Sequence, residues 1–180
     1  KLGLRIFGCY LVIFCFCFAY PVTWVLDTLR TRYLEGVEDP LVDQANMLAT
    51  MVGVQWARST FSPDELYQTF KAIYARELDA QIYHLTKSRV DVALYITDAQ
   101  GRVIFHSRDQ SQIGADYTHW RDVALTLNGQ YGARTTLADL DDETSSVLYV
   151  AAPIQIKGAV AGVLTVAKPT TNINSFLQRA

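Results

Sequence analysis

The chain has 180 residues, with 16 basic and 18 acidic side chains and a net charge of −2 at pH 7. This length allows one ordinary domain beside a membrane anchor, and the charge balance offers no electrostatic footprint for nucleic acid. All three cysteines precede residue 18, so the rest of the chain holds neither a disulfide nor a thiolate metal site.

An apolar run without any charged side chain extends from Phe7 to Leu26. A helix of this length rises about 30 Å, which matches the hydrocarbon core of a bilayer. A secretory signal peptide would have a shorter apolar region, of about 7 to 15 residues, followed by a small-residue cleavage site. No such site occurs here, so we expect a transmembrane helix at 7–26 after a cytoplasmic tail at 1–6.

The charges that flank this run give little information on its orientation. Lys1 and Arg5 favour a cytoplasmic N-terminus, whereas Arg30 and Arg32 beyond the run favour the reverse. A short basic tail stays in the cytoplasm easily. We therefore expect the N-terminus inside and the following domain outside.

Apolar residues recur at steps of three or four from Asp27 to Arg58. This spacing predicts a long helix, with mild interruptions at Gly36 and Pro40. Its apolar stripe is suited to covering a sheet. The same helix could also pair with a second copy of the chain and conduct a signal, and the two interpretations are compatible.

A second helix is predicted from Pro63 to Asp79. Ser62 is its N-cap, proline takes the first helical position, and Glu65 follows three residues after the cap. Residues 81–90 fit either the start of a strand or the end of this helix, and the pattern leaves both open.

From residue 92 onward the apolar period changes to two, which is typical of strands. Val92–Thr97 and Arg102–Ser107 flank a turn-forming segment and together predict a β-hairpin. A short helix is predicted over 118–128, with Thr118 as a candidate cap and Gly129 as its terminator. Three further strands are predicted, at Tyr131–Leu137, Ser145–Ile156 and Ala159–Lys168.

Together these elements predict an α+β domain over residues 27–168, with a five-stranded antiparallel sheet, helices on one face and a long N-terminal helix. Gly162 inside the last strand indicates a bulge or a close backbone approach, and Pro169 ends that strand. Residues 169–180 return to helical spacing. We expect them to form an exit helix that leads towards a second membrane segment.

Three sequence segments are informative together with this element order. They are YITDAQGRVIFHS at 95–107, IGADYTHWRDVALTLNGQYGART at 113–135, and SSVLYVAAPI with GVLTVAKP at 145–154 and 162–169. The chain resembles, over its whole length, the extracytoplasmic sensing domain of bacterial two-component sensor histidine kinases, of the PAS-like type called single Cache or PDC. The middle segment is the most particular of the three.

The resemblance implies a ligand-sensing, signal-input domain of a kinase in the bacterial inner membrane, with the sensing domain periplasmic or extracellular. It also implies a homodimer formed through the long N-terminal helix, and no cofactor. None of His84, His106 and His119 lies in a phospho-acceptor context, and no glycine-rich nucleotide box occurs. We therefore expect this chain to be catalytically inert, with the kinase part beyond residue 180.

Two other functions remain open. A sensor that responds to a membrane or periplasmic protein would need an exposed apolar patch rather than a ligand cavity. The same sensing module could instead belong to a chemoreceptor or a cyclic-dinucleotide enzyme. An enzyme within the chain has no sequence support, because no G-x-S-x-G, H-E-x-x-H or P-loop string occurs.

Domains of the resembled type hold a small ligand between one sheet face and the short helix with its preceding loop. A guanidinium binds a carboxylate through two hydrogen bonds, and a lysine adds a point charge, so an organic anion is the candidate ligand. The predicted ligand-binding residues are Arg134, Tyr149, Lys168, Tyr117, Trp120, Arg121 and Tyr95.

These residues also have purely structural interpretations. Arg134 could pair with Asp122 or with the acidic loop at 139–143, and Lys168 could point into solvent. The aromatic residues are often core residues. His106 and His119 have no partner at metal-ligand spacing, so no metal site is predicted.

Overall fold

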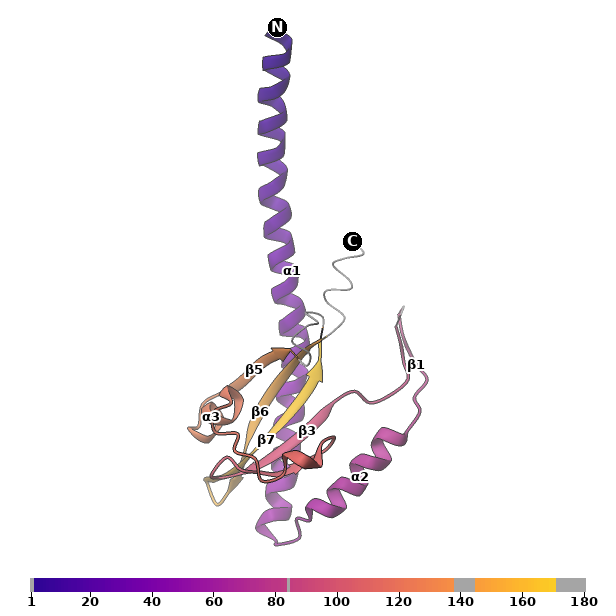
Figure 1. Cartoon of the computed structure of the whole chain (residues 1–180), viewed down its shortest axis with the longest axis vertical. Helices are drawn as coiled ribbons and strands as arrows, with labels where there is room; N and C mark the ends of the chain where they lie inside the picture. Colours follow the sequence, from indigo (N-terminus) through magenta and orange to yellow (C-terminus); the bar gives the residue numbers. More distant parts are fainter. Residues whose placement is uncertain (1, 84, 138–144, 171–180) are drawn as a thin grey trace. The chain divides into compact units, whose positions relative to one another are not determined.

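Figure 1 shows the computed structural model of the chain, which describes residues 2–83, 85–137 and 145–170. The chain forms two compact units, Lys1–Asp39 and Pro40–Ala180. Two predicted features fall outside the described residues. These are the acidic loop at 139–143 and, beyond Thr170, the exit helix.

The first helix, α1, extends from Leu2 to Ala57 and contains both N-terminal segments that the sequence predicts as helical. It continues through Gly36 and Pro40, so neither residue ends it. Among the residues that the structure describes, no helix combines the length and the apolar character that a membrane span requires.

The part of α1 in the second unit has one buried face. At Gly53 the helix comes so close to β-structure that an added Cβ would lie 3.2 Å from the carbonyl oxygen of Gln155. The buried residues follow helical spacing, as expected for a helix that covers a sheet. They are Leu41, Ala45, Ala49 and Val52.

The second helix, α2 (Pro63–Ala75), begins where the sequence predicts it. The backbone N–H of Glu65 donates to Ser62 Oγ at 3.3 Å, which confirms Ser62 as the cap. The helix ends before the predicted Asp79 because Arg76 adopts an extended backbone. The segment that the sequence left open then forms a small hairpin.

The described strands form two antiparallel sheets. A two-stranded sheet pairs β1 with β2, and a five-stranded sheet has the order β4-β3-β7-β6-β5. The five predicted strands are therefore confirmed, with ends that differ by at most one residue. The strands are β1 (Ala80–Ile82), β2 (Leu85–Lys87), β3 (Ala93–Asp98), β4 (Val103–His106), β5 (Gly132–Leu137), β6 (Ser146–Ile156) and β7 (Ala159–Pro169).

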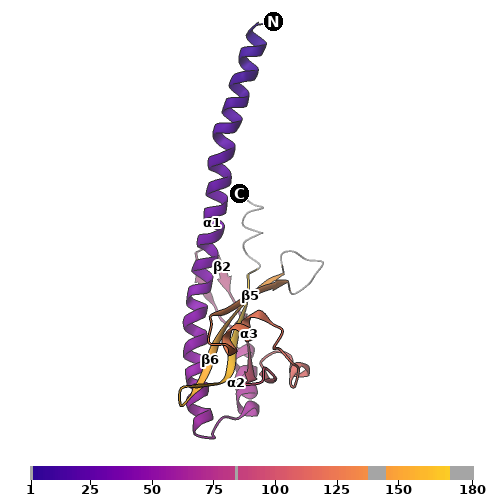
Figure 2. The same cartoon turned by 90° about the vertical axis from the view of Figure 1, so that its left-hand side faces the viewer.

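Helices cover both faces of the five-stranded sheet, whereas the sequence predicted them on one face only (Figure 2). Val123 of the short helix α3 (Arg121–Leu127) packs on the face that carries Tyr95. Phe70 of α2 packs against Phe105 on the other face, with tilted rings whose centroids are 5.7 Å apart. Strand β7 is buried continuously over Val163–Ala167, because a central strand between two covered faces has no solvent side.

The predicted short helix starts later than its proposed cap. The Thr118 hydroxyl donates to Asp116 Oδ1 at 2.7 Å, and Trp120 takes the N-cap position of α3. Gly162 makes the close approach that the sequence indicates, since an added Cβ would collide with the carbonyl oxygen of Thr97.

Candidate functional site

The face of the sheet under α3 carries a buried polar group where an apolar core is expected. Helix α3 turns three of its residues inward, namely Asp122, Val123 and Thr126. Asp122 is completely inaccessible to solvent. A buried carboxylate is costly unless charged and hydrogen-bonding partners surround it, so its neighbours define the local structure.

Three strands supply those neighbours. Arg134 Nε of β5 donates to Asp122 Oδ1 at 2.6 Å, and the two side chains are 10% and 0% exposed. Tyr95 Oη of β3 makes a very short hydrogen bond to Asp122 Oδ2. The Thr165 hydroxyl of β7 donates to the same oxygen at 3.2 Å. Both carboxylate oxygens are therefore satisfied within the protein.

The guanidinium of Arg134 is also held from both sides. Its Cζ lies 4.0 Å from the Trp120 ring centroid and 3.8 Å from the Tyr149 ring centroid. Such cation–π contacts strengthen when the cation is desolvated. Arg134 Nη1 donates to Thr136 Oγ1 at 2.8 Å. We call these side chains the Asp122 cluster: Tyr95, Trp120, Asp122, Arg134, Tyr149 and Thr165.

Burial and charge fix the protonation states in this cluster. Burial alone would lower the pKa of Arg134, but the Asp122 carboxylate raises it, and the net pKa lies above the usual value. Burial and the same carboxylate together raise the pKa of Tyr95 well above 10.0. Arg134 therefore stays protonated and the Tyr95 phenol stays neutral across the physiological pH range.

A cavity of about 440 Å³ lies next to the Asp122 cluster, on the same face of the sheet. Its volume is within the range of about 300 to 1,000 Å³ that is usual for small-molecule sites. Tyr95 and Tyr149 belong to both the cluster and the cavity wall. Most of the remaining wall is apolar and comes from residues where β3 and β6 begin and β7 ends, namely Ala93, Leu94, Val147, Ala167 and Pro169.

His106, the last residue of β4, lines this cavity with a defined orientation. Its Nδ1 accepts the backbone N–H groups of Asp109, at 2.9 Å, and Arg108, at 3.3 Å. Its ring stacks with that of Tyr95, with centroids 6.1 Å apart and an angle of 10° between the planes. Burial lowers the pKa of His106 below 6.5, and Asp109 opposes this only in part.

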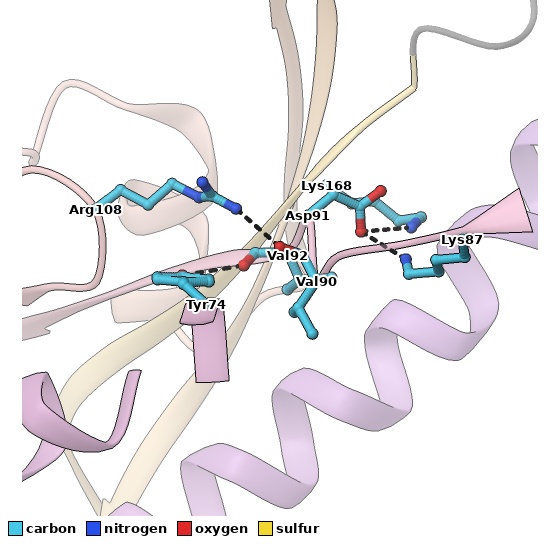
Figure 3. Close-up of polar contacts among 7 residues, drawn as sticks. All are labelled: Tyr74, Lys87, Val90, Asp91, Val92, Arg108 and Lys168. Atoms are coloured by element: carbon cyan, nitrogen blue, oxygen red, sulfur yellow. Dashed lines mark hydrogen bonds and ion pairs between the residues drawn. The ribbon is translucent and has the colours of Figure 1, made fainter. Parts of the chain in front are cut away.

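Charged residues adjoin the cavity at the start of β3. Asp91 Oδ1 accepts from Lys87 Nζ at 2.8 Å and lies 3.5 Å from Lys168 Nζ (Figure 3). Arg108 Nη2 donates to the carbonyl oxygen of Val90 at 3.2 Å. Both Asp91 and Arg108 line the cavity.

Asp91 stays ionised in this setting. Burial alone would raise the pKa of its carboxyl group, but the hydrogen bond from Lys87 and the charge of Lys168 together lower it. One carboxylate thus neutralises part of the charge of two lysines. The group as a whole is cationic.

The structure brings together most, but not all, of the predicted ligand-binding residues. Tyr117 contacts both Tyr95 and Trp120 edge-on, at centroid distances of 5.1 and 6.2 Å, so five of the seven predicted residues are contiguous. Lys168 is not among them, because it alternates with Ala167 and leaves the sheet on the opposite face. Arg121 is exposed at the first position of α3.

Among the charged and titratable residues of the cavity wall, sequence reasoning missed Asp91, His106 and Arg108. His106 lies within the predicted strand Arg102–Ser107, and strand alternation could have placed it beside Tyr95 on the neighbouring strand. Asp91 and Arg108 lie in loops, where strand alternation gives no direction. Among the residues that the structure describes, no three acidic, histidine or cysteine side chains gather as a metal site would require.

No protein-family model matches the chain. Over all of its 180 residues the chain is 33% identical to Sensor protein CreC of Escherichia coli (strain K12). The chain spans 38% of the length of that relative.

Two solved structures are similar to this chain at low sequence identity. An extracellular ligand binding receptor from Desulfohalobium retbaense DSM5692 aligns with 84% of this chain and 26% of its own, with a TM-score of 0.52 and 14% identity. The sensor domain of the V. cholerae histidine kinase DctB aligns with 86% of this chain and 54% of its own, with a TM-score of 0.45 and 20% identity.

Proposed function

We propose that this chain is a sensor domain of the CreC type and the signal-input domain of a membrane-bound two-component sensor histidine kinase. In this proposal the catalytic half of the kinase follows residue 180. The observation that carries the proposal is the match to a sensor protein along the entire chain, together with a cavity on the sheet beside a buried polar cluster.

The proposal includes a membrane anchor at Phe7–Leu26 and a sensing domain outside the membrane. The run is uncharged, and its large side chains are exposed, including Phe14, Phe16 and Trp24. Exposed apolar surface of this extent needs a cover, and lipid is the cover that fits a helix. Among the described residues, no helix is long and apolar enough to cross a membrane, so the proposed anchor needs a direct test. That test is flotation of the chain with lipid vesicles.

We further propose that α1 mediates a homodimer. Opposite its buried face, α1 exposes a second apolar stripe in the Pro40–Ala180 unit. Met47, Met51 and Val54 are 60%, 61% and 47% exposed and recur at steps of four and three residues. This spacing suits pairing with the same stripe of a second copy.

The proposed mechanism is a shift between two packings of the sheet against α1. A ligand shifts this equilibrium only if it binds one packing more tightly than the other. Among the predicted ligand-binding residues, Tyr95 and Tyr149 line the cavity and are proposed as ligand contacts. Arg134 and Trp120 support them from the Asp122 cluster.

A hybrid kinase tests this function. The chain replaces the aligned segment of the E. coli relative, and phosphorylation of the hybrid is measured in cells. We expect Asp122→Ala to abolish the kinase output or to lock it in one state, because this change disrupts the sensing sheet. Arg121→Gln, at an exposed position, should leave the output unchanged. An output that is the same with the folded and the disrupted domain would contradict a signal-input role.

A further inference from the structure

Building on the proposed function, we infer that the cavity beside the Asp122 cluster binds a small organic anion through Arg108 and the Nε2–H of His106. Both residues line the cavity, and neither belongs to the Asp122 cluster. The hydrogen-bond donors of the cavity and the charge around it support this ligand class.

Arg134 is not available for this role. Its guanidinium is bonded to Asp122 and Thr136 and enclosed by two aromatic rings. Arg134 also does not line the cavity. The anion anchor must therefore be another cation, and Arg108 is the arginine that lines the cavity.

Arg108 is exposed and preoriented. Its Cζ lies 4.3 Å from the Tyr74 ring centroid, and its Nη2 donates to the carbonyl oxygen of Val90. Tyr74 is itself fixed by a hydrogen bond from its hydroxyl to Ser107 Oγ at 2.7 Å. A guanidinium carries five N–H donors, so the fork retains donors for a carboxylate or phosphate while its position is held.

His106 supplies an uncharged donor deeper on the sheet. Because its Nδ1 accepts two backbone N–H groups, the proton of the neutral ring is on Nε2. Stacking on Tyr95 keeps the ring in place. The cavity thus has one donor on the sheet and a charged fork in the loop after β4, which suits a ligand with acidic oxygens.

The carboxylate in the wall does not repel an anion. The Asp91 carboxylate is paired with both Lys87 and Lys168, whereas the Arg108 guanidinium is bonded to the Val90 carbonyl and has no carboxylate partner among the described contacts (Figure 3). The apolar remainder of the wall favours a ligand with a short hydrocarbon body. A carboxylate and a phosphate share the necessary oxygen chemistry, and the test separates them.

The test is isothermal titration calorimetry on the full chain in lipid nanodiscs. The probes are propionate, succinate and inorganic phosphate, with propionamide as the uncharged isostere of propionate. We expect at least one anion to bind and propionamide not to bind. Binding of both carboxylates without phosphate identifies a carboxylate site, and the reverse identifies a phosphate site.

Three variants assign the binding groups. Arg108→Gln should weaken anion binding about ten- to a hundredfold, because a charge-assisted hydrogen bond is lost. His106→Asn keeps an acceptor near the Nδ1 position, removes the Nε2–H, and should weaken binding less. Arg121→Gln removes an exposed arginine outside the cavity and should leave binding unchanged.

Thermal unfolding of each variant without ligand shows whether it remains folded. If Arg108→Gln does not fold, the anion affinity of His106→Asn becomes the decisive measurement. Absence of binding by all three anions would overturn the inference, as would equal binding of propionamide or unchanged affinity in the decisive variant. The hybrid kinase is scored independently of these probes. A functional hybrid without anion binding refutes this inference and leaves the proposed function standing.

Discussion

Asp122 links one helix and three strands through a single carboxylate. Its oxygens accept from Arg134, Tyr95 and Thr165, which belong to β5, β3 and β7. A fold tolerates a buried charge with a full set of partners, whereas loss of one partner strongly lowers the free energy of unfolding. The energetic role of the pair therefore appears only when one member is removed.

We predict strong non-additivity for this pair. Removing either partner, by Asp122→Ala or Arg134→Met, leaves an unpaired buried charge and should cost about 3–5 kcal/mol of unfolding free energy. The double variant should cost clearly less than the sum of the two single changes. Urea unfolding of all four proteins measures the coupling, and additive costs would show that the ion pair is not a unit.

His106 should make stability depend on pH. Burial lowers its folded pKa below 6.5, so between these two values the unfolded chain binds more protons than the folded chain. This stability contribution is complete above pH 6.5 and is lost as the pH falls towards the folded pKa.

The measurement is urea unfolding at pH 7.5 and 5.5. The original protein should lose more stability between these pH values than His106→Asn does. His119→Asn, at an exposed position, should retain the original dependence. Equal pH dependence in the original protein and His106→Asn would rule out this role for His106.

At single positions, sequence reasoning located aromatic residues better than charged ones. Alternation along a strand places Tyr95 and Tyr149 on a face, so their convergence could be predicted. The partner of Arg134 could only be offered as a choice between Asp122 and a loop, since that choice depends on how α3 packs on the sheet. Lys168 alternates with Ala167 and leaves the sheet on the other face, and its Nζ lies 3.5 Å from Asp91 of the cavity wall.

Among the elements, the packing of α3 on the sheet depends on one small residue. At Gly132 in β5, an added Cβ would collide with the backbone of Asp122 and with the Thr126 hydroxyl. The helix therefore lies against the strand at a distance that only glycine permits. The contact also fixes the position of the Asp122 carboxylate.

Gly132→Ala should displace α3 and destabilise the protein by about 1–3 kcal/mol, the usual cost of overpacking. Gly36→Ala is the matched control, because an added Cβ there meets no atom within 4 Å. Alanine is also the better helix former, so the control should not destabilise. Thermal unfolding compares them, and equal midpoints for both variants would mean that α3 does not depend on this contact.

The exposed stripe of α1 predicts self-association. Charges at its centre, introduced by Met47→Glu and Met51→Glu, should abolish dimers of the full chain in nanodiscs or detergent. Glu at two exposed α1 positions outside the stripe, Asn46 and Ala57, should have little effect. Analytical ultracentrifugation measures the result, and dimers that survive both stripe changes would place the interface elsewhere.

The sequence predicts the type of each helix or strand better than its end residues or the sheet face that it covers. The period-two runs gave the five strands of the larger sheet, and Ser62 gave the start of α2. Helices on both faces were not foreseen, because a continuously apolar strand such as β7 does not indicate which layer covers each side. The hairpin of β1 and β2 is too short to show a period.

In the molecule as a whole, we propose that a signal passes from a cavity on one face of the sheet to helix α1 on the other face. Central strand β7 has the cavity-lining Ala167 on one face and Leu164, which is fully buried, on the opposite face. A ligand that shifts this strand changes the surface on which α1 rests. Transmission then requires that displacement of α1 alters the output of the attached kinase.

The most direct test of this claim locks α1 to its partner in the hybrid kinase. Met51→Cys is introduced after Cys9, Cys15 and Cys17 are replaced by serine, and autophosphorylation is measured in nanodiscs before and after oxidation. We expect a disulfide to form between the two α1 helices and to change the autophosphorylation rate several-fold. Reduction of the disulfide should restore the original rate. An unchanged rate despite complete cross-linking, or no cross-linking at all, would contradict this claim.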